Sequence, residues 1–150
     1  MALIYVDMSV ALAHLLGEGE APPESLWEEA LISSRLLEYE SWVRIHSLGL
    51  GDSHGEPLRS LLGRLAFLEL ARPVLARALE PFPLAVRTLD AIHLASVEFL
   101  RSQNQSVTLA TYDSRMREAA ERIGPALGSA VTQADLGSPF LLTPSKTSQK

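Results

Sequence analysis

The chain has no cysteine among its 150 residues. This excludes a disulfide framework, a zinc site built on thiolates and a cysteine nucleophile, so any bound metal must be held by oxygen or imidazole ligands. Positive charge is also scarce, since 13 Lys and Arg stand against 18 Asp and Glu and the net charge is −5. This balance counts against simple electrostatic binding of nucleic acid, but it does not exclude a nuclease whose bound cations reverse the local field.

Long apolar runs are missing as well. Residues 1–20 are apolar enough to suggest a signal peptide, but they lack a basic segment and Asp7 interrupts the run, so we expect a strand followed by a helix. No uninterrupted apolar stretch approaches the roughly 20 residues that a membrane span needs. The composition, with 47% hydrophobic and 21% charged residues, is typical of an ordinary folded domain. We therefore expect a soluble, cytoplasmic domain that does not enter a membrane.

Short β-rich runs alternate with segments of helical periodicity along most of the chain. Strands are predicted at residues 3–7, 31–34, 69–74 and 106–113. Helical segments are predicted at residues 9–16, 35–50, 57–70, 73–82, 89–103 and 114–124, with a loop at 51–56. This alternation predicts an α/β domain around a mostly parallel sheet. The domain is expected to span residues 1–135, and residues 136–150, rich in Pro and Ser, are expected to form a flexible C-terminal tail.

Four acids are candidates for a shared site. Asp7 ends the first predicted strand and Asp113 ends a later one, and ligands of parallel sheets bind at the carboxyl ends of the strands. Glu40 and Asp90 lie on predicted helices that can bring them to the same edge. Mg²⁺ and Mn²⁺ prefer hard oxygen ligands, so three or four acids from separate segments are the expected construction. Such a site favours hydrolysis of a phosphodiester.

Each acid also has a purely structural interpretation. Asp7 and Asp113 each precede a predicted helix and suit its N-cap position. Glu40 is spaced to pair with Arg44, four residues later on the same helix. Asp90 lies in the first turn of its helix, where the helix dipole tolerates an acid. The residues taken by themselves leave both interpretations open.

The helix that carries Asp90 has so little polar surface that we expect it to be mostly buried. Thr88 is its predicted N-cap. Over residues 89–97, its polar residues Asp90, His93 and Ser96 form one slanted stripe. His93 is interpreted as a hydrogen-bonded core histidine and not as a ligand or base. The other three histidines show no metal-binding spacing.

Four motifs, in this order, resemble those of the PIN-domain ribonucleases, specifically the VapC type of toxin in bacterial toxin–antitoxin pairs. They are "IYVDMSVAL", "ISSRLLEYESWVR", "RTLDAIHLAS" and "TLATYDSRMREAAERIG", and they extend over most of the chain. The resemblance implies a PIN-like α/β/α sandwich. It also implies that Asp7, Glu40, Asp90 and Asp113 line one pocket and bind Mg²⁺ or Mn²⁺ for RNA cleavage. The spacing from the serines of the second motif favours Glu40 over Glu38.

The same resemblance implies further parts of the site and its partners. Ser9 and Thr111 correspond to hydroxyl residues that hydrogen-bond around the acids. The family often reads Asp-Thr-Ser at the first motif, whereas this chain has Met8 in the middle position and lacks one hydroxyl. An RNA substrate, a VapB-like antitoxin and a homodimer are implied. Arginines beside the motifs are candidates for contacts with RNA phosphates: Arg35, Arg44, Arg87, Arg115 and Arg117.

Two other functions compete with a toxin endoribonuclease. A PIN-like fold that binds RNA or an antitoxin without cleavage is compatible with Met8 and with the acidic net charge. A phosphoacceptor receiver domain also gathers aspartates at strand ends, but it requires two adjacent acids after the first strand and a lysine after a late one. The lysines here are Lys146 and Lys150, both in the predicted tail. The expected function is therefore a metal-dependent endoribonuclease.

Overall fold

The computed structural model of the protein describes residues 3–17, 19–123, 130–131 and 140–142. Its strands are β1 (Leu3–Val6), β2 (Ala30–Ser34), β3 (Ala66–Leu68), β4 (Val107–Thr111), β5 (Ala130–Val131) and β6 (Phe140–Leu142). Its α-helices are α1 (Met8–Leu16), α2 (Leu36–Ser47), α3 (Gly51–Leu62), α4 (Arg72–Ala78), α5 (Thr88–Ser102) and α6 (Ser114–Arg122), and a 3₁₀ helix, η1, covers Glu24–Glu28. Strands and helices alternate, as the sequence predicts.

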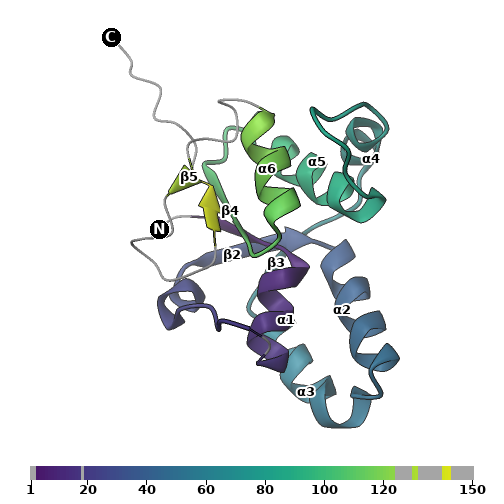
Figure 1. Ribbon diagram of the computed structural model, residues 1–150, viewed down its shortest axis with the longest axis vertical. Helices are drawn as coiled ribbons and strands as arrows, with labels where there is room; N and C mark the ends of the chain where they lie inside the picture. Colours follow the sequence, from purple (N-terminus) through teal and green to yellow (C-terminus); the bar gives the residue numbers. More distant parts are fainter. Residues whose placement is uncertain (1–2, 18, 124–129, 132–139, 143–150) are drawn as a thin grey trace.

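The strands form one sheet in the order β3-β2-β1-β4-β6-β5. The first four in this order run parallel, while β6 and β5 are antiparallel to their neighbours. In the pairing of the two central strands, Val6 lies opposite Ala110. Parallel neighbours need crossover connections, and the helices that make them cover both faces of the sheet (Figure 1). The predicted α/β sandwich with a mostly parallel sheet is confirmed.

Alternating side chains of β1 divide the core into two parts. Ile4 and Val6 pack with α1, α2 and α3 on one face of the sheet, whereas Tyr5 packs with α5 and α6 on the other. The buried side of α5 contributes Leu94 and Val97 to the second part. Helix α4 packs against α5 and extends this layer. Both faces of β1 are therefore covered, and its carboxyl end, where the chain enters α1, is fully buried at Val6.

The loop predicted at residues 51–56 is wrong, because α3 begins at Gly51 and runs through this segment. Its composition, with two glycines, Asp and Ser, is typical of a turn, but the helix gains its stability from packing. Leu58 and Leu61 are buried in the core, and Gly55 lies against the Trp42 ring of α2. Tertiary contacts of this kind override weak local preference.

Two smaller predictions are also wrong. The strand expected at residues 69–74 is instead β3, a few residues earlier, and α4 occupies the second half of that segment with Pro73 in its first turn. Thr88 is not the N-cap of α5, because Arg87 holds that position and no side chain caps the helix there. The predicted helix over residues 57–70 is only partly right, since α3 ends at Leu62.

The C-terminal region bears on the predicted domain boundary. Gly124, expected to close α6, lies outside the described residues, as does most of the predicted tail at 136–150. Within that tail, β6 pairs with β4, so these three residues belong to the sheet of the domain. No helix in the part of the chain that the structure describes is long and apolar enough to cross a membrane.

The buried face of α5 should dominate stability on its side of the sheet. Leu94 is fully buried, so Leu94→Ala should lower the free energy of unfolding by about 2–5 kcal/mol. Leu79, 88% exposed, offers a matched control. Leu79→Ala should change that free energy by no more than about 0.5 kcal/mol. Urea denaturation followed by circular dichroism measures both, and equal losses in the two variants would contradict this division of the core.

Candidate functional site

Asp7 lies at the carboxyl end of β1 and is buried, with 3% of its surface exposed. Its Oδ1 accepts hydrogen bonds from the Ser9 hydroxyl, at 2.6 Å, and from the backbone N–H of Val10, at 3.2 Å. Its Oδ2 accepts from the Thr111 hydroxyl. Burial raises the pKa of Asp7, and the hydrogen bonds from Ser9 and Thr111 oppose that rise. Asp7 is thus both the N-cap of α1 and a buried acid at the sheet edge.

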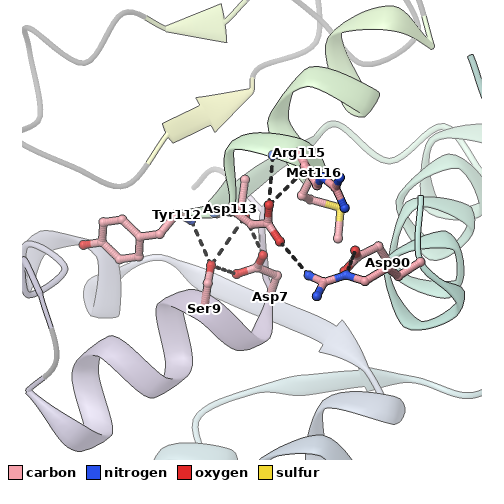
Figure 2. A network of polar contacts seen from close by, with 9 residues as sticks. Asp7, Ser9, Asp90, Tyr112, Asp113, Arg115 and Met116 are labelled. Atoms are coloured by element: carbon pink, nitrogen blue, oxygen red, sulfur yellow. Dashed lines mark hydrogen bonds and ion pairs between the residues drawn. The ribbon is translucent and has the colours of Figure 1, made fainter. Parts of the chain in front are cut away.

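Asp113 follows β4 and caps α6 in the same way. Its Oδ1 accepts from the backbone N–H groups of Arg115, at 2.9 Å, and Met116, at 3.3 Å. Its own backbone N–H donates to the Thr111 hydroxyl, which in turn donates to Asp7. A single threonine therefore connects two of the acids. Figure 2 shows the side chains of Asp7 and Asp113 facing the same space from different elements.

Asp90 reaches this space from the first turn of α5 (Figure 2). Its Oδ2 lies 3.3 Å from Nε of Arg87, and Oδ2 of Asp113 lies 3.5 Å from Nη2 of the same guanidinium. Arg87 therefore bridges two acids, although its side chain is 70% exposed. Arg87 is predicted from the sequence as a candidate for contact with RNA phosphates, but its bridge between two acids is not predictable from its place beside the motif.

Glu40 projects from α2, and its carboxylate contacts His93 of α5. The distance from Glu40 Oε1 to His93 Nε2 is 2.5 Å, and the Glu40 side chain is 7% exposed. The pair with Arg44 that the helical spacing allows does not form. His93 is a buried, hydrogen-bonded histidine as interpreted, but it lies against one of the four candidate acids and is connected to the site in a way that the sequence analysis missed.

The structure thus brings Asp7, Asp90 and Asp113 to one edge of the sheet and holds Glu40 beside them through His93. The four carboxylates are not arranged around one point. Within residues 3–17 and 19–123, no three His, Asp or Glu side chains are placed to share a metal ion. Asp90 and Asp113 instead share the guanidinium of Arg87, and Glu40 contacts His93, so a metal held by Asp90 and Asp113 would have to displace Arg87.

Met8, where the family often has a threonine, is partly buried against the core. Together with Glu40, Arg44 and Leu89 it lines an open cavity of about 300 Å³ between α2 and the start of α5. A larger cavity, about 780 Å³, lies between α4, α5 and the segment that joins them. Its walls are mainly apolar and none of the four acids lines it.

The arginines beside the motifs differ in whether they form ion pairs with neighbouring acids. Arg35 pairs with Glu38 at 3.0 Å and Glu69 at 2.7 Å, and Arg117 pairs with Glu121 at 3.3 Å, so these two have protein partners. Arg44 and Arg115 are exposed. Arg87 is exposed as well, although it pairs with Asp90 and Asp113, so Arg44, Arg87 and Arg115 are the exposed members of this set.

The PIN domain family matches residues 4–122, which include all four acids. Among known proteins, Ribonuclease VapC46 of Mycobacterium tuberculosis is 35% identical over 130 residues, 85% of this chain and 97% of the relative. Ribonuclease VapC35 of the same species is 32% identical over 131 residues, 83% of this chain and 95% of the relative. Ribonuclease VapC47 is 28% identical over 128 residues, 81% of this chain and 93% of the relative. No solved structure matches this chain.

Because Asp7 is buried, its replacement by the neutral asparagine should stabilise the protein by an amount that depends on pH. In Asp7→Asn, the amide oxygen still accepts from Ser9 and Val10 and the amide NH₂ faces Thr111, so the contacts are kept and the buried charge is lost. The variant should therefore unfold at a higher temperature than the unaltered protein at pH 7 in the absence of metal.

The sign of the pH dependence follows from the raised pKa of Asp7. The folded protein retains a proton that the unfolded chain releases above about pH 3.8, so the unaltered protein loses stability as the pH rises through the folded-state pKa. The advantage of Asp7→Asn should be greatest above that pKa and vanish below pH 3.8. Thermal melting between pH 3 and 8 measures it, with exposed Asp52→Asn as the matched control. A variant less stable than the unaltered protein at pH 7 would contradict the assignment.

Proposed function

The chain belongs to the PIN-domain family, and we propose that it is an endoribonuclease of the VapC toxin type that requires Mg²⁺ or Mn²⁺. The observation that carries the proposal is the position of Asp7. It is buried at the sheet edge with Asp90 and Asp113, accepts three hydrogen bonds, and has no Lys or Arg paired with it among the described residues. A buried carboxylate without a basic partner is costly, and a bound cation would stabilise it.

The donors fit a hard divalent cation. All four are carboxylates, and the chain has no cysteine to favour a softer metal. In this proposal Asp7, Glu40, Asp90 and Asp113 hold the ion, which would supply the positive charge and the activated water that phosphodiester hydrolysis requires. Ser9 and Thr111 keep the Asp7 carboxylate in one orientation, and the N-terminus of α6 does the same for Asp113.

Arg87 acts in this proposal as the cation of the metal-free site. Its guanidinium pairs with Asp90 and Asp113, and it would have to leave them for these two acids to hold a divalent ion. The released side chain would be free to form bidentate contacts with an RNA phosphate. Arg44 and Arg115, both exposed near the acids, are suited to further phosphate contacts.

The likeness to VapC proteins supports the remaining parts of the proposal. The protein acts on RNA in the cytoplasm as a homodimer and is held inactive by a VapB-like antitoxin. The match over 81–85% of this chain and 93–97% of the relatives supports the transfer of this arrangement as a whole.

Purified protein should cleave RNA when Mg²⁺ or Mn²⁺ is added and should stop when EDTA removes the metal. Asp90→Asn should lower the cleavage rate by more than about 100-fold, the scale of losing one contact that stabilises charge in the transition state. Asp52→Asn, an exposed acid of α3, should cleave at the unaltered rate. Single-turnover cleavage of a labelled RNA measures all three, with circular dichroism to show that each variant is folded.

The alternative, a PIN fold that binds without cleaving, makes a different prediction in the same experiment. Met8 in place of a family hydroxyl is the observation in its favour. A folded protein that binds no Mn²⁺ at millimolar concentration and leaves RNA intact would support this binding module. Cleavage that persists with EDTA and in Asp90→Asn would exclude the proposed mechanism.

Replacement of Arg87 should strengthen metal binding. Arg87→Gln removes the competing cation, and because the side chain is 70% exposed its ion pairs are weak, so Mn²⁺ affinity should rise by only about two- to tenfold. Arg64→Gln, which changes an exposed arginine just after α3, is the matched control and should leave the affinity unaltered. Isothermal titration with Mn²⁺ measures both. Weaker binding in Arg87→Gln would show that Arg87 supports the site instead of competing with the ion.

A further inference from the structure

Glu40 differs from the three aspartates in how it is held. The aspartates lie at strand ends or in a first helical turn, whereas Glu40 lies in the second turn of α2 on a longer side chain. Its contact with His93, Oε1 to Nε2 at 2.5 Å, joins two side chains that are 7% and 2% exposed. Away from water, a hydrogen bond to a carboxylate is short and strong. His93 is thus the group that determines where the Glu40 carboxylate lies.

The other side of the His93 ring is also fixed. Its Nδ1 lies 2.6 Å from the hydroxyl of Tyr5, a fully buried residue of the central strand β1. The Tyr5 oxygen in turn accepts the backbone N–H of Ser34, at the end of β2, at 3.2 Å. The ring of His93 also packs edge-on against the ring of Tyr5, with centroids 5.8 Å apart. Two strands of the sheet therefore hold the imidazole in place.

The direction of the protons follows from these contacts. A carboxylate only accepts hydrogen bonds, so the contact with Glu40 places a proton on Nε2 of His93. Burial raises the pKa of Tyr5, so its phenol keeps its proton, which can be donated to Nδ1 of His93. In this arrangement Tyr5 donates to His93 and His93 donates to Glu40.

We propose that His93 is a positioning residue, which holds the carboxylate of Glu40 toward the three aspartates through Nε2–H while Tyr5 holds the imidazole through Nδ1. The inference rests on the proposed function, since the task it gives Glu40 is to help bind the divalent cation. His93 occupies Oε1 of Glu40 and leaves Oε2 for the ion. The helix α5 would then supply one acid, Asp90, and orient a second from one turn further along.

Glu40 has an alternative position that this contact prevents. Arg44 lies four residues later on the same helix, is exposed, and lines the same cavity as Glu40. An i,i+4 pair between them would be the ordinary outcome on an isolated helix. Such a pair would draw the carboxylate along α2 and away from α5. His93 is therefore expected to act on metal binding by selecting one rotamer of Glu40.

Two substitutions separate the roles of the two ring nitrogens. His93→Leu removes both, and it should weaken Mn²⁺ binding by about 10- to 100-fold, the usual effect of losing a group that orients a metal ligand. His93→Gln places an amide N–H near the position of Nε2 and should recover most of the affinity. Isothermal titration measures affinity, and thermal melting without metal records stability separately. Tyr5→Phe, which keeps the ring and removes only the hydroxyl, tests the support if His93→Leu does not fold.

A double-mutant cycle distinguishes positioning from a general effect on the fold. In a Glu40→Gln background, His93→Leu should cause no further loss of Mn²⁺ affinity, because the carboxylate that it orients is gone. It should still lower the melting temperature there as it does in the unaltered protein. The same loss of affinity in both backgrounds would overturn the proposal. So would a folded His93→Leu variant that binds Mn²⁺ as tightly as the unaltered protein, or a His93→Gln variant as weak as His93→Leu.

The tautomer gives a readout that needs neither metal nor RNA. In ¹⁵N-labelled metal-free protein, the nitrogen shifts of His93 should show a protonated Nε2 and an unprotonated Nδ1, and Tyr5→Phe should disturb this distribution. A proton on Nδ1 with a bare Nε2 would overturn the inference. If the unaltered protein binds no Mn²⁺ and cleaves no RNA while this tautomer is present, the proposed function fails and the hydrogen-bond arrangement stands. The two failures are therefore distinguishable.

Discussion

The parallel pairing of β1 with β4 is the constraint on which the site depends. Val6, the last residue of β1, lies opposite Ala110, the last but one of β4, so the two strands end within one residue of each other at the same edge of the sheet. Asp7 follows directly after β1, while Thr111 ends β4 and Asp113 begins the turn into α6. The hydrogen bond from Thr111 to Asp7 connects these two exits. A shift of one residue in this register would turn Thr111 to the other face and separate the two aspartates.

Each of the four acids is compensated by a different kind of group in the absence of metal. Asp7 accepts two hydroxyls and a backbone N–H, Asp113 accepts the N-terminal amides of α6, Asp90 pairs with Arg87, and Glu40 accepts from His93. Hydrogen bonds from neutral groups leave the negative charge in place, while an arginine cancels it. Arg87 also pairs with Asp113, so among the four acids Asp7 and Glu40 are the two that have no ion pair with a Lys or Arg in the described part of the chain.

Much of this arrangement is predictable from the sequence because it depends on local patterns. Alternating strands and helices indicate the sheet, and an acid that directly follows a strand must lie at its carboxyl end. The two interpretations of Asp7 and Asp113, helix cap or site acid, proved compatible: in Asp113 one oxygen caps α6 and the other faces Arg87. The roles of the four acids remain predictions, since the fold brings them together without showing what they bind.

The parts that were missed depend on contacts between distant segments. The helix α3 is stabilised through Leu58 and the packing of Gly55 on Trp42, which its turn-like composition conceals. The contact of His93 with Glu40 spans 53 residues and that with Tyr5 spans 88, so no local spacing indicates either. The polar stripe on α5 indicates that His93 has a hydrogen-bond partner, because a buried polar group needs one, but it does not identify that partner.

Solvent exposure distinguishes Arg87, which a cation could displace, from the buried or backbone groups that hold the other carboxylates. His93, Thr111 and the amides of α6 are built into buried or backbone structure, so the carboxylates that they hold are fixed before any ion arrives. Arg87 is 70% exposed and joins the acids through long contacts of 3.3 and 3.5 Å. Entry of a cation would therefore displace one solvent-accessible side chain, and the carboxylates, of which no three in the described part of the chain are placed to share an ion, would have to close around it. The buried contacts limit how each carboxylate can turn, and this restriction would help a site with four acids to form in a chain that has few positive charges.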